Sequence, residues 1–208
     1  MHSRRSKALA AKLFNPIVAP DRPLIPYAAR SGFIYAGRLE AVKNVDAIIR
    51  NYAMLPAEIK TMHNLNIVGT GSREKSLKKL VQELGQVDFV TFHGQIDGEA
   101  VYKIIGRSTM LLMSSSHEGF PMAIAESLTS GTPVISTDVG DIYSVVKNGY
   151  NGVLLADGYT YSDFYERVRS VLDDFEAFSG NALKSSSVFN AEEISKSLIS
   201  ACDSIIGL

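Results

Sequence analysis

The stretch MLLMSSSHEGFPMAIAESLTSGTPVIS, residues 110–136, decides the fold class. It begins with a short apolar run, Met110–Met113, and ends with another at 134–136. Between them Pro121 suits the first position of a helix that we predict to run to residue 130, because the first turn leaves its backbone N–H groups unused. Strand, helix and strand in this order form a βαβ unit, which predicts two parallel strands in one sheet.

The same alternation of apolar runs and helical segments continues in both directions. It predicts further strands at 33–36, 65–68, 89–92 and 153–155, and helices at 45–55, 72–84, 98–105, near 161–176 and at 191–206. The predicted fold class is therefore α/β, a Rossmann-like three-layer α/β/α domain with a parallel sheet. We assign this domain to residues 31–178 and a C-terminal helical segment to residues 179–208.

Composition excludes several classes of function. The 208 residues carry a formal net charge of −1, and 46% are apolar, which is typical of a soluble domain and argues against nucleic acid as a partner. The one cysteine, Cys202, excludes an internal disulfide and a cysteine-based metal cluster, and fits a reducing compartment. The four histidines are scattered along the chain, so we predict no zinc site.

Residues 1–30 differ from the rest of the chain. MHSRRSKALAAKLF, residues 1–14, predicts a basic, weakly amphipathic helix without the apolar core of a secretory signal. A solvated helix end and a contact with a membrane surface both stay open for it. NPIVAPDRPLIP, residues 15–26, holds four prolines and predicts an extended linker. No apolar run approaches the roughly 18 residues that a membrane span needs.

The residues that carry chemistry follow the predicted strands, and ligands of such sheets bind at the carboxyl ends of the strands. Gly69 and Gly71 follow one strand, and glycines there let backbone N–H groups approach an anion or a ring. The full G-x-G-x-x-G fingerprint fails because Glu74 holds its sixth position, which weakens a dehydrogenase assignment. A plain tight turn stays equally open for these glycines.

Two cations follow the first strand of the predicted domain. Arg38 and Lys43 come after Gly37, five residues apart. An arginine fork with a lysine point charge suits a diphosphate group. Two solvated surface cations are the alternative.

Two acids flank the start of the helix in the opening stretch. Its free N–H groups and its dipole favour an anion at the crevice, and Glu118 precedes it in the loop. Glu126 lies about 7.5 Å further along the helix axis, roughly the reach from a phosphate to the next sugar ring. Both acids are open to an alternative as solvated surface groups. Glycoside hydrolysis also uses two carboxylates, but it needs no phosphate-binding helix end between them.

Five segments together resemble a known family. They are FIYAGRLEAVKNVD (33–46), LNIVGTGSREKSLKKL (65–80), VTFHGQI (90–96), SSSHEGFPMAIAESLTSGTPVISTDVG (114–140) and NGYNGVLL (148–155). Over roughly residues 15–175 the chain is similar to the C-terminal, donor-binding domain of retaining GT-B glycosyltransferases of family 4. The resemblance implies a transferase that moves a hexose from a nucleotide diphosphate sugar to a glycan or lipid-linked acceptor, as in polysaccharide biosynthesis.

The resemblance also implies roles for residues of this chain. Arg38 and Lys43, after Gly37, would hold the diphosphate, Glu118 would contact hydroxyls of the transferred sugar, and Glu126 would bind the ribose. The backbone of Gly119, Phe120, Pro121 and Met122 would bind sugar and phosphate. Gly69 and Gly71, with the backbone near Gln95 and Ile96, would frame the base. Catalysis would need no cofactor and no metal ion, because cationic side chains and the helix end supply the positive charge.

Two residues depart from the family pattern. Asn44 follows Lys43 where glycine is usual, which we expect to alter only the turn. Asp141 follows Gly140 where a small residue is common, and it would repel a phosphate if it faced the cleft.

The expected organisation is incomplete for catalysis. Residues 1–30 resemble the tail of an acceptor-binding N-terminal domain, so the chain alone is expected to bind donor and to be inactive. The family favours a UDP-linked hexose and a cytoplasmic location, with a peripheral position at the inner face of a membrane as an alternative. A separate donor subunit that pairs with an acceptor subunit and a GT-B-related nucleotide-sugar epimerase remain as other functions.

Overall fold

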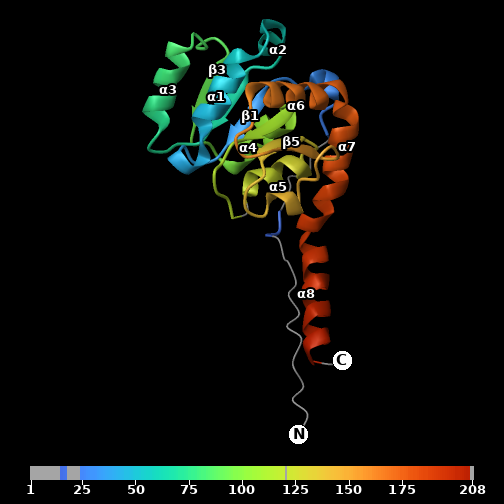
Figure 1. Ribbon diagram of the computed structural model, residues 1–208. Coiled ribbons are helices and arrows are strands. Elements are labelled where there is room, and N and C mark those ends of the chain that lie inside the picture. Colours follow the sequence, from blue (N-terminus) through green and yellow to red (C-terminus); the bar gives the residue numbers. More distant parts are fainter. Residues whose placement is uncertain (1–14, 18–23, 120, 207–208) are drawn as a thin grey trace.

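A parallel sheet forms the centre of the computed structural model, which describes residues 15–17, 24–119 and 121–206 (Figure 1). In this part of the chain six strands pair in the order β3-β2-β1-β4-β5-β6, each pair parallel. They are β1 (Phe33–Ala36), β2 (Leu65–Val68), β3 (Val90–Gly94), β4 (Met110–Met113), β5 (Val134–Thr137) and β6 (Gly152–Leu155). The predicted α/β class and its parallel sheet are confirmed.

Helices connect these strands and cover the sheet. They are α1 (Val45–Met54), α2 (Ala57–Met62), α3 (Glu74–Glu83), α4 (Gly98–Arg107), α5 (Met122–Thr129), α6 (Tyr161–Asp173), α7 (Phe175–Ser185) and α8 (Ala191–Ile206). Short 3-10 turns are η1 (Tyr27–Ala29), η2 (Ala41–Lys43), η3 (Ile142–Ser144) and η4 (Ser186–Phe189). The sequence analysis missed α2 and α7, and it placed Pro121 one residue too deep: Pro121 is the N-cap, and α5 begins at Met122.

Both faces of the sheet are apolar, as a parallel sheet requires. Alternate residues of β1 point to opposite sides: Phe33 and Tyr35 join one hydrophobic cluster, and Ile34 and Ala36 join another. Helix α1 packs against α3 and α6 on one side of the sheet, while α5 packs against α4 and α7 on the other. These two helix layers enclose the sheet and give the predicted three layers.

Arg30 fastens the segment before β1 to the far end of α5. Its Nη1 donates to Gly131 O at 3.1 Å and to Thr132 Oγ1 at 2.9 Å. Its Nη2 donates to Ser130 O at 3.0 Å, and its Nε donates to Ile25 O at 2.8 Å. Burial lowers the pKa of Arg30 to about 10, so the guanidinium stays charged at neutral pH. It therefore binds carbonyl groups that the end of α5 leaves free.

The ends of the chain are described in part. The helix predicted for residues 1–14 lies outside the described residues, and so does part of the predicted linker. Helix α7 spans residue 178, the predicted end of the domain, and α8 projects away from the body in Figure 1. The division into segments at 30/31 and 178/179 stays a prediction. Over the described ranges, no helix combines the length and apolarity needed to cross a membrane.

Candidate functional site

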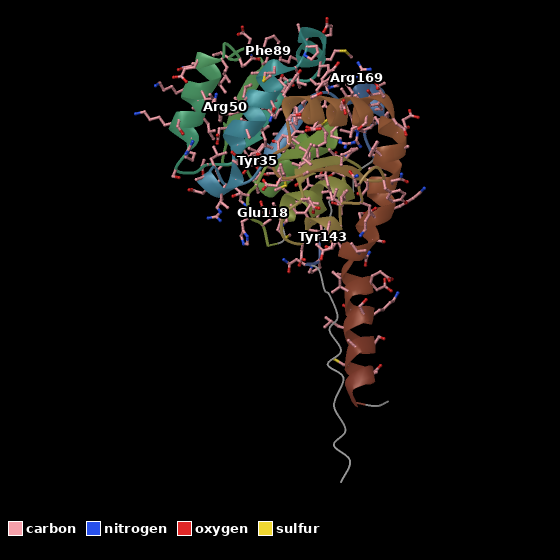
Figure 2. All side chains as sticks on the ribbon, viewed as in Figure 1. Tyr35, Arg50, Phe89, Glu118, Tyr143 and Arg169 are labelled. Carbon is pink, nitrogen blue, oxygen red and sulfur yellow. The ribbon has the colours of Figure 1, made fainter. Side chains whose placement is uncertain are left out.

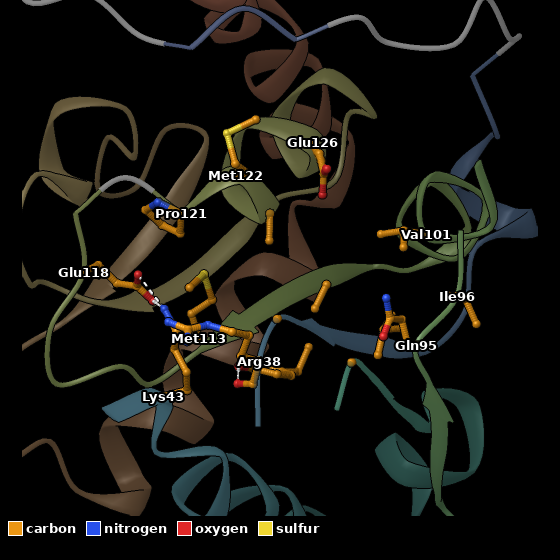
Figure 3. Close-up of a pocket in the computed structure, with 16 residues that line it drawn as sticks. Arg38, Lys43, Gln95, Ile96, Val101, Met113, Glu118, Pro121, Met122 and Glu126 are labelled. Carbon is orange, nitrogen blue, oxygen red and sulfur yellow. Dashed lines mark hydrogen bonds and ion pairs between the residues drawn. The ribbon is translucent and has the colours of Figure 1, made fainter. Parts of the chain in front are cut away.

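A cleft of about 490 Å³ opens at the carboxyl ends of β1, β2 and β4 (Figure 3). The strand order reverses between β1 and β4, because the chain runs outward from β1 through β2 to β3 and then returns to β4 on the other side. Such a switch point leaves a crevice between the loops that follow the two strands. In Figure 2, Glu118 lies at this edge of the sheet, whereas Phe89 lies at the opposite edge.

The cleft is lined by strand ends, by the loops that follow β1 and β3, and by the first turns of α5. The lining residues are Tyr35, Ala36, Gly37, Arg38, Lys43, Val68, Gly69, Gln95, Ile96, Val101, Met113, Glu118, Pro121, Met122, Ala123 and Glu126.

All but three of the predicted site residues line this cleft. Phe120 lies outside the described residues, and Gly119 is not part of the lining. Gly71 also lies outside the lining, and a Cβ there would stand 2.4 Å from Leu39 O. The absent side chain of Gly71 lets the loop after β2 lie directly against the loop after β1. Gly71 thus allows the loops after β1 and β2 to pack against each other.

Several lining residues were not predicted as site residues. They are Tyr35, Ala36, Val68, Val101, Met113 and Ala123. Five of them are apolar side chains at strand ends or helix starts, where the sequence shows only the usual core pattern. Tyr35 donates its hydroxyl to Arg38 O at 2.8 Å and so supports the loop that carries the arginine. Burial, with a smaller contribution from Glu118, raises the pKa of Tyr35.

Lys43 and Glu118 form an ion pair across the mouth of the cleft (Figure 3). Lys43 Nζ lies 2.7 Å from both carboxylate oxygens, and Ser115 Oγ donates to Glu118 Oε1 at 2.6 Å. The side chains of Lys43 and Glu118 are 16% and 5% exposed. Oε1 therefore accepts from two donors. Among the described residues Oε2 accepts only from Lys43, so it has room for another donor.

Asn44 sets the direction of the chain directly after Lys43. It has φ 49° and ψ 39°, the left-handed conformation, and no other non-glycine residue in the described ranges has a positive φ. Its carbonyl accepts a hydrogen bond from Ser114 Oγ at 2.6 Å. Asparagine tolerates this conformation better than most residues. Asparagine therefore fits the conformation that this turn requires.

Glu126 faces the cleft from α5. The neighbouring side chains Ile124, Ala125 and Leu128 are fully buried, as predicted for the inner face of this helix. Within the described part of the chain, the Glu126 carboxylate has no hydrogen-bond or ion-pair partner. Burial raises its pKa. The cleft thus contains a carboxylate that a hydroxyl-bearing ligand would satisfy.

The raised pKa of Glu126 predicts a pH-dependent stability. A glutamate whose pKa is higher in the folded state lowers stability as the pH rises from its ordinary value of 4.5 through the raised one. We expect Glu126→Gln to melt above wild type at pH 7, and the difference to vanish towards pH 4. Melting curves across this range measure it. Glu166→Gln, at an exposed site on α6, is the control and should follow wild type.

Two further expectations concern charge near the cleft. Asp141 is not part of the lining, and it is exposed. Among the described residues, no group of three or more His, Cys, Asp or Glu side chains is placed to hold a metal ion. Independence from metal stays a prediction.

Several known proteins are similar to this chain in sequence. A D-inositol 3-phosphate glycosyltransferase of Arthrobacter is 26% identical over 150 residues, which are 71% of this chain and 35% of that protein. The GtfA subunit of a UDP-N-acetylglucosamine–peptide N-acetylglucosaminyltransferase of Streptococcus gordonii is 30% identical over 138 residues, 65% of this chain and 26% of that protein. This chain therefore spans only about a third of the length of such relatives.

Solved structures are similar to this chain in fold. The lipopolysaccharide outer core galactosyltransferase WaaB superposes with a TM-score of 0.80 at 25% identity, over 93% of this chain and 55% of that chain. The pneumococcal O-GlcNAc transferase GtfA, solved with UDP and GlcNAc, gives a TM-score of 0.74 at 19% identity, over 86% of this chain and 37% of that one. At that identity the second likeness shows the fold alone. The model of the family "Glycosyl transferases group 1" matches residues 28–182, and the chain belongs to this family.

Proposed function

We propose that this chain is the donor-binding domain of a retaining glycosyltransferase that moves a hexose from a nucleotide diphosphate, UDP by preference, to a glycan or lipid-linked acceptor. The observation that carries the proposal is the convergence of two cations, two carboxylates and a helix N-terminus in one cleft. Retention and the UDP preference follow from the family resemblance of the motifs around Glu118.

The diphosphate is assigned to Arg38, Lys43 and the start of α5. Lys43 has three N–H donors, so it is able to bind a phosphate oxygen while it keeps a bond to Glu118. The first backbone N–H groups of α5 have no partner within the helix, and the helix dipole adds partial positive charge there. When the bond between the sugar and the diphosphate breaks, these groups stabilise the charge that develops on the leaving group.

The two carboxylates are assigned to hydroxyl groups. The unfilled acceptor position on Glu118 Oε2 suits a hydroxyl of the transferred sugar, close to the phosphate site at Lys43. Glu126 lies further along α5 and suits the ribose. The end of the cleft beyond Glu126 is lined by Gly69, Gln95 and Ile96. We therefore assign the base to this end, next to β2 and β3.

Binding of a nucleotide sugar is the direct test. Saturation at about 100 times the dissociation constant stabilises a protein by about 2.7 kcal/mol, which corresponds to a rise in Tm of roughly 5–10 °C for a chain of this size. Melting curves with millimolar UDP-glucose, UDP-galactose, UDP-N-acetylglucosamine, GDP-mannose and NAD are expected to show this rise with a UDP-sugar. A panel without any nucleotide-dependent shift contradicts the proposal, and a shift with NAD alone supports a dehydrogenase.

Arg38→Ala is the informative variant, because the Arg38 side chain is exposed and its loss should leave folding intact. We expect this variant to melt like wild type without ligand and to lose most of the UDP-sugar shift. Arg50→Ala is the matched control, since Arg50 is an exposed arginine on α1 outside the cleft lining (Figure 2). Equal shifts in both variants contradict the role of Arg38.

A second candidate is a donor subunit that works with a separate acceptor subunit. The likeness to a relative whose name describes a subunit favours it. Both candidates predict that this chain alone binds donor and transfers no sugar. Co-expression with the product of the neighbouring gene, followed by size-exclusion chromatography, separates them: a stable complex supports the subunit, and a lone monomer contradicts it.

A further inference from the structure

A second cleft, of about 680 Å³, opens at the same edge of the sheet. One wall is the face of α1 and its cap that carries Asn44, Ala47 and Asn51. The others are the loops that follow β4, β5 and β6, at residues 114–116, 137–139 and 157–159. The sequence analysis did not predict this cleft, and the family motifs assigned above leave it without a ligand.

The charge of the second cleft is opposite to that of the first. Asp138 and Asp157 both line it and are exposed, and neither carboxylate has a partner within the described residues. No lysine or arginine of the described chain lines it. Two unpaired carboxylates without a cation disfavour a phosphate or any other anion. They are strong acceptors for hydroxyl groups.

Tyr159 adds an apolar surface beside these acceptors. Its hydroxyl accepts from Asn51 Nδ2 at 3.3 Å, and Asn51 Nδ2 also donates to Ala47 O at 2.9 Å. These bonds hold the half-buried phenol ring in place and leave its own proton free for a ligand. An amphipathic ring next to carboxylates and serine hydroxyls suits a ligand with hydroxyl edges and an apolar face. A sugar ring has this chemistry.

The two clefts share a wall. Lys43 lines the first cleft, and the next residue, Asn44, lines the second. Glu118 lines the first, and Ser115, which donates to Glu118 Oε1 at 2.6 Å, lines the second. A ligand in the second cleft is therefore separated from the proposed sugar position at Glu118 by one layer of side chains.

We propose that the second cleft binds an uncharged sugar ring, and that this ring belongs to the acceptor. The second half of this inference rests on the proposed function, because it needs the donor sugar at Glu118. The cleft supplies Asp138, Asp157 and Tyr159 for hydroxyl groups, and its charge selects a neutral acceptor unit over a phosphorylated one.

NMR titration of the ¹⁵N-labelled chain tests the inference with methyl α-glucoside as the probe. We expect amide shifts at 137–139 and 157–159, with a dissociation constant in the millimolar range, as for a ligand of so few atoms. The shifts should persist with saturating UDP present. Glucose 6-phosphate should shift these amides at least about tenfold more weakly.

Variants assign the effect to the carboxylates. Asp138→Ala combined with Asp157→Ala should weaken methyl α-glucoside binding at least about tenfold and leave the UDP shifts unchanged, because neither residue lines the first cleft. Asp88→Ala, an exposed aspartate in the turn before β3, removes the same kind of charge at the other edge and should change nothing.

Three results overturn the inference. They are an absence of shifts up to about 100 mM methyl α-glucoside, a glucoside site that UDP displaces, and equal binding of glucose 6-phosphate. The UDP titration without sugar separates this failure from that of the donor site. If UDP shifts the amides of 69 and 95 while the glucoside shifts none, only the second cleft is wrong. If the glucoside binds and UDP does not, the donor assignment is wrong, and so is the acceptor part of this inference.

Discussion

Lys43→Ala is expected to lower the free energy of unfolding by about 3 kcal/mol, because it leaves the Glu118 carboxylate buried without a counter-charge. The Glu118 side chain is only 5% exposed, so water in the cleft would solvate the carboxylate only in part after the ammonium group is lost. Ser115 remains as a donor to one oxygen and does not neutralise the charge. Urea unfolding followed by circular dichroism measures the loss.

The double variant Lys43→Ala/Glu118→Gln separates the charge from other effects. Without the carboxylate charge, most of the lost stability should return, whereas UDP-sugar binding should remain absent because both ligand groups are changed. Lys79→Ala is the matched control: Lys79 pairs with Glu83 at 3.3 Å, but their side chains are 76% and 56% exposed. Its cost should stay below about 0.5 kcal/mol. A Lys43→Ala loss as small as this contradicts the role given to the ion pair.

Gly140→Ala is expected to cost about 3 kcal/mol and to weaken UDP-sugar binding at least tenfold. Gly140 has φ +58°, and a Cβ there would stand 2.0 Å from Glu118 O. The backbone of the loop that carries Glu118 would have to move, and its carboxylate would move with it. Stability by urea unfolding and affinity by titration calorimetry are the two measurements.

Gly149→Ala separates the effect of backbone strain from that of the steric clash with Glu118 O. Gly149 has φ +74°, and among the described residues no atom other than those of Gly149 and its two chain neighbours lies within 4 Å of the position that a Cβ would take. We expect it to cost about 1–2 kcal/mol, the strain of a left-handed alanine alone, and to bind UDP-sugar like wild type. If both glycine variants lose affinity for UDP-sugar equally, the loss is not caused by the contact between Gly140 and the loop that carries Glu118.

Much of this architecture is readable from the sequence, because the strands are short runs that are buried on both faces. β1, for example, is buried at all four positions, so FIYA carries an unbroken apolar signal. The loops that follow such strands must meet at one edge, which is why Arg38, Glu118 and Glu126 were predicted to lie together. Helix α2 escaped prediction because its six residues are too few to show a period. Gly180 and Asn181 obscured α7, since both lower helix propensity.

Contacts between side chains far apart in the chain could not be predicted from the sequence. Lys43 and Glu118 are 75 residues apart, and both were predicted as ligand groups, but no pattern indicates that they bind each other. The second cleft left no motif because it takes a few residues from each of four segments that lie far apart in the sequence. Its residues become a set only when the strand order places β4, β5 and β6 side by side.

Arg30 shows that the smallest piece able to fold on its own is larger than the family motifs suggest. The proline-rich composition before residue 31 marks a natural place to shorten the chain, since the first strand starts at Phe33. A piece that begins at Ser31 would lack the guanidinium that binds Ser130 O and Gly131 O, and Gly131 O would keep only the hydrogen bond from Ser179 Oγ. Helix α5, whose other end forms the phosphate side of the cleft, is thus completed by a residue 91 positions upstream of Pro121 in the chain. Any minimal expressed fragment should keep the residues from Leu24 onward.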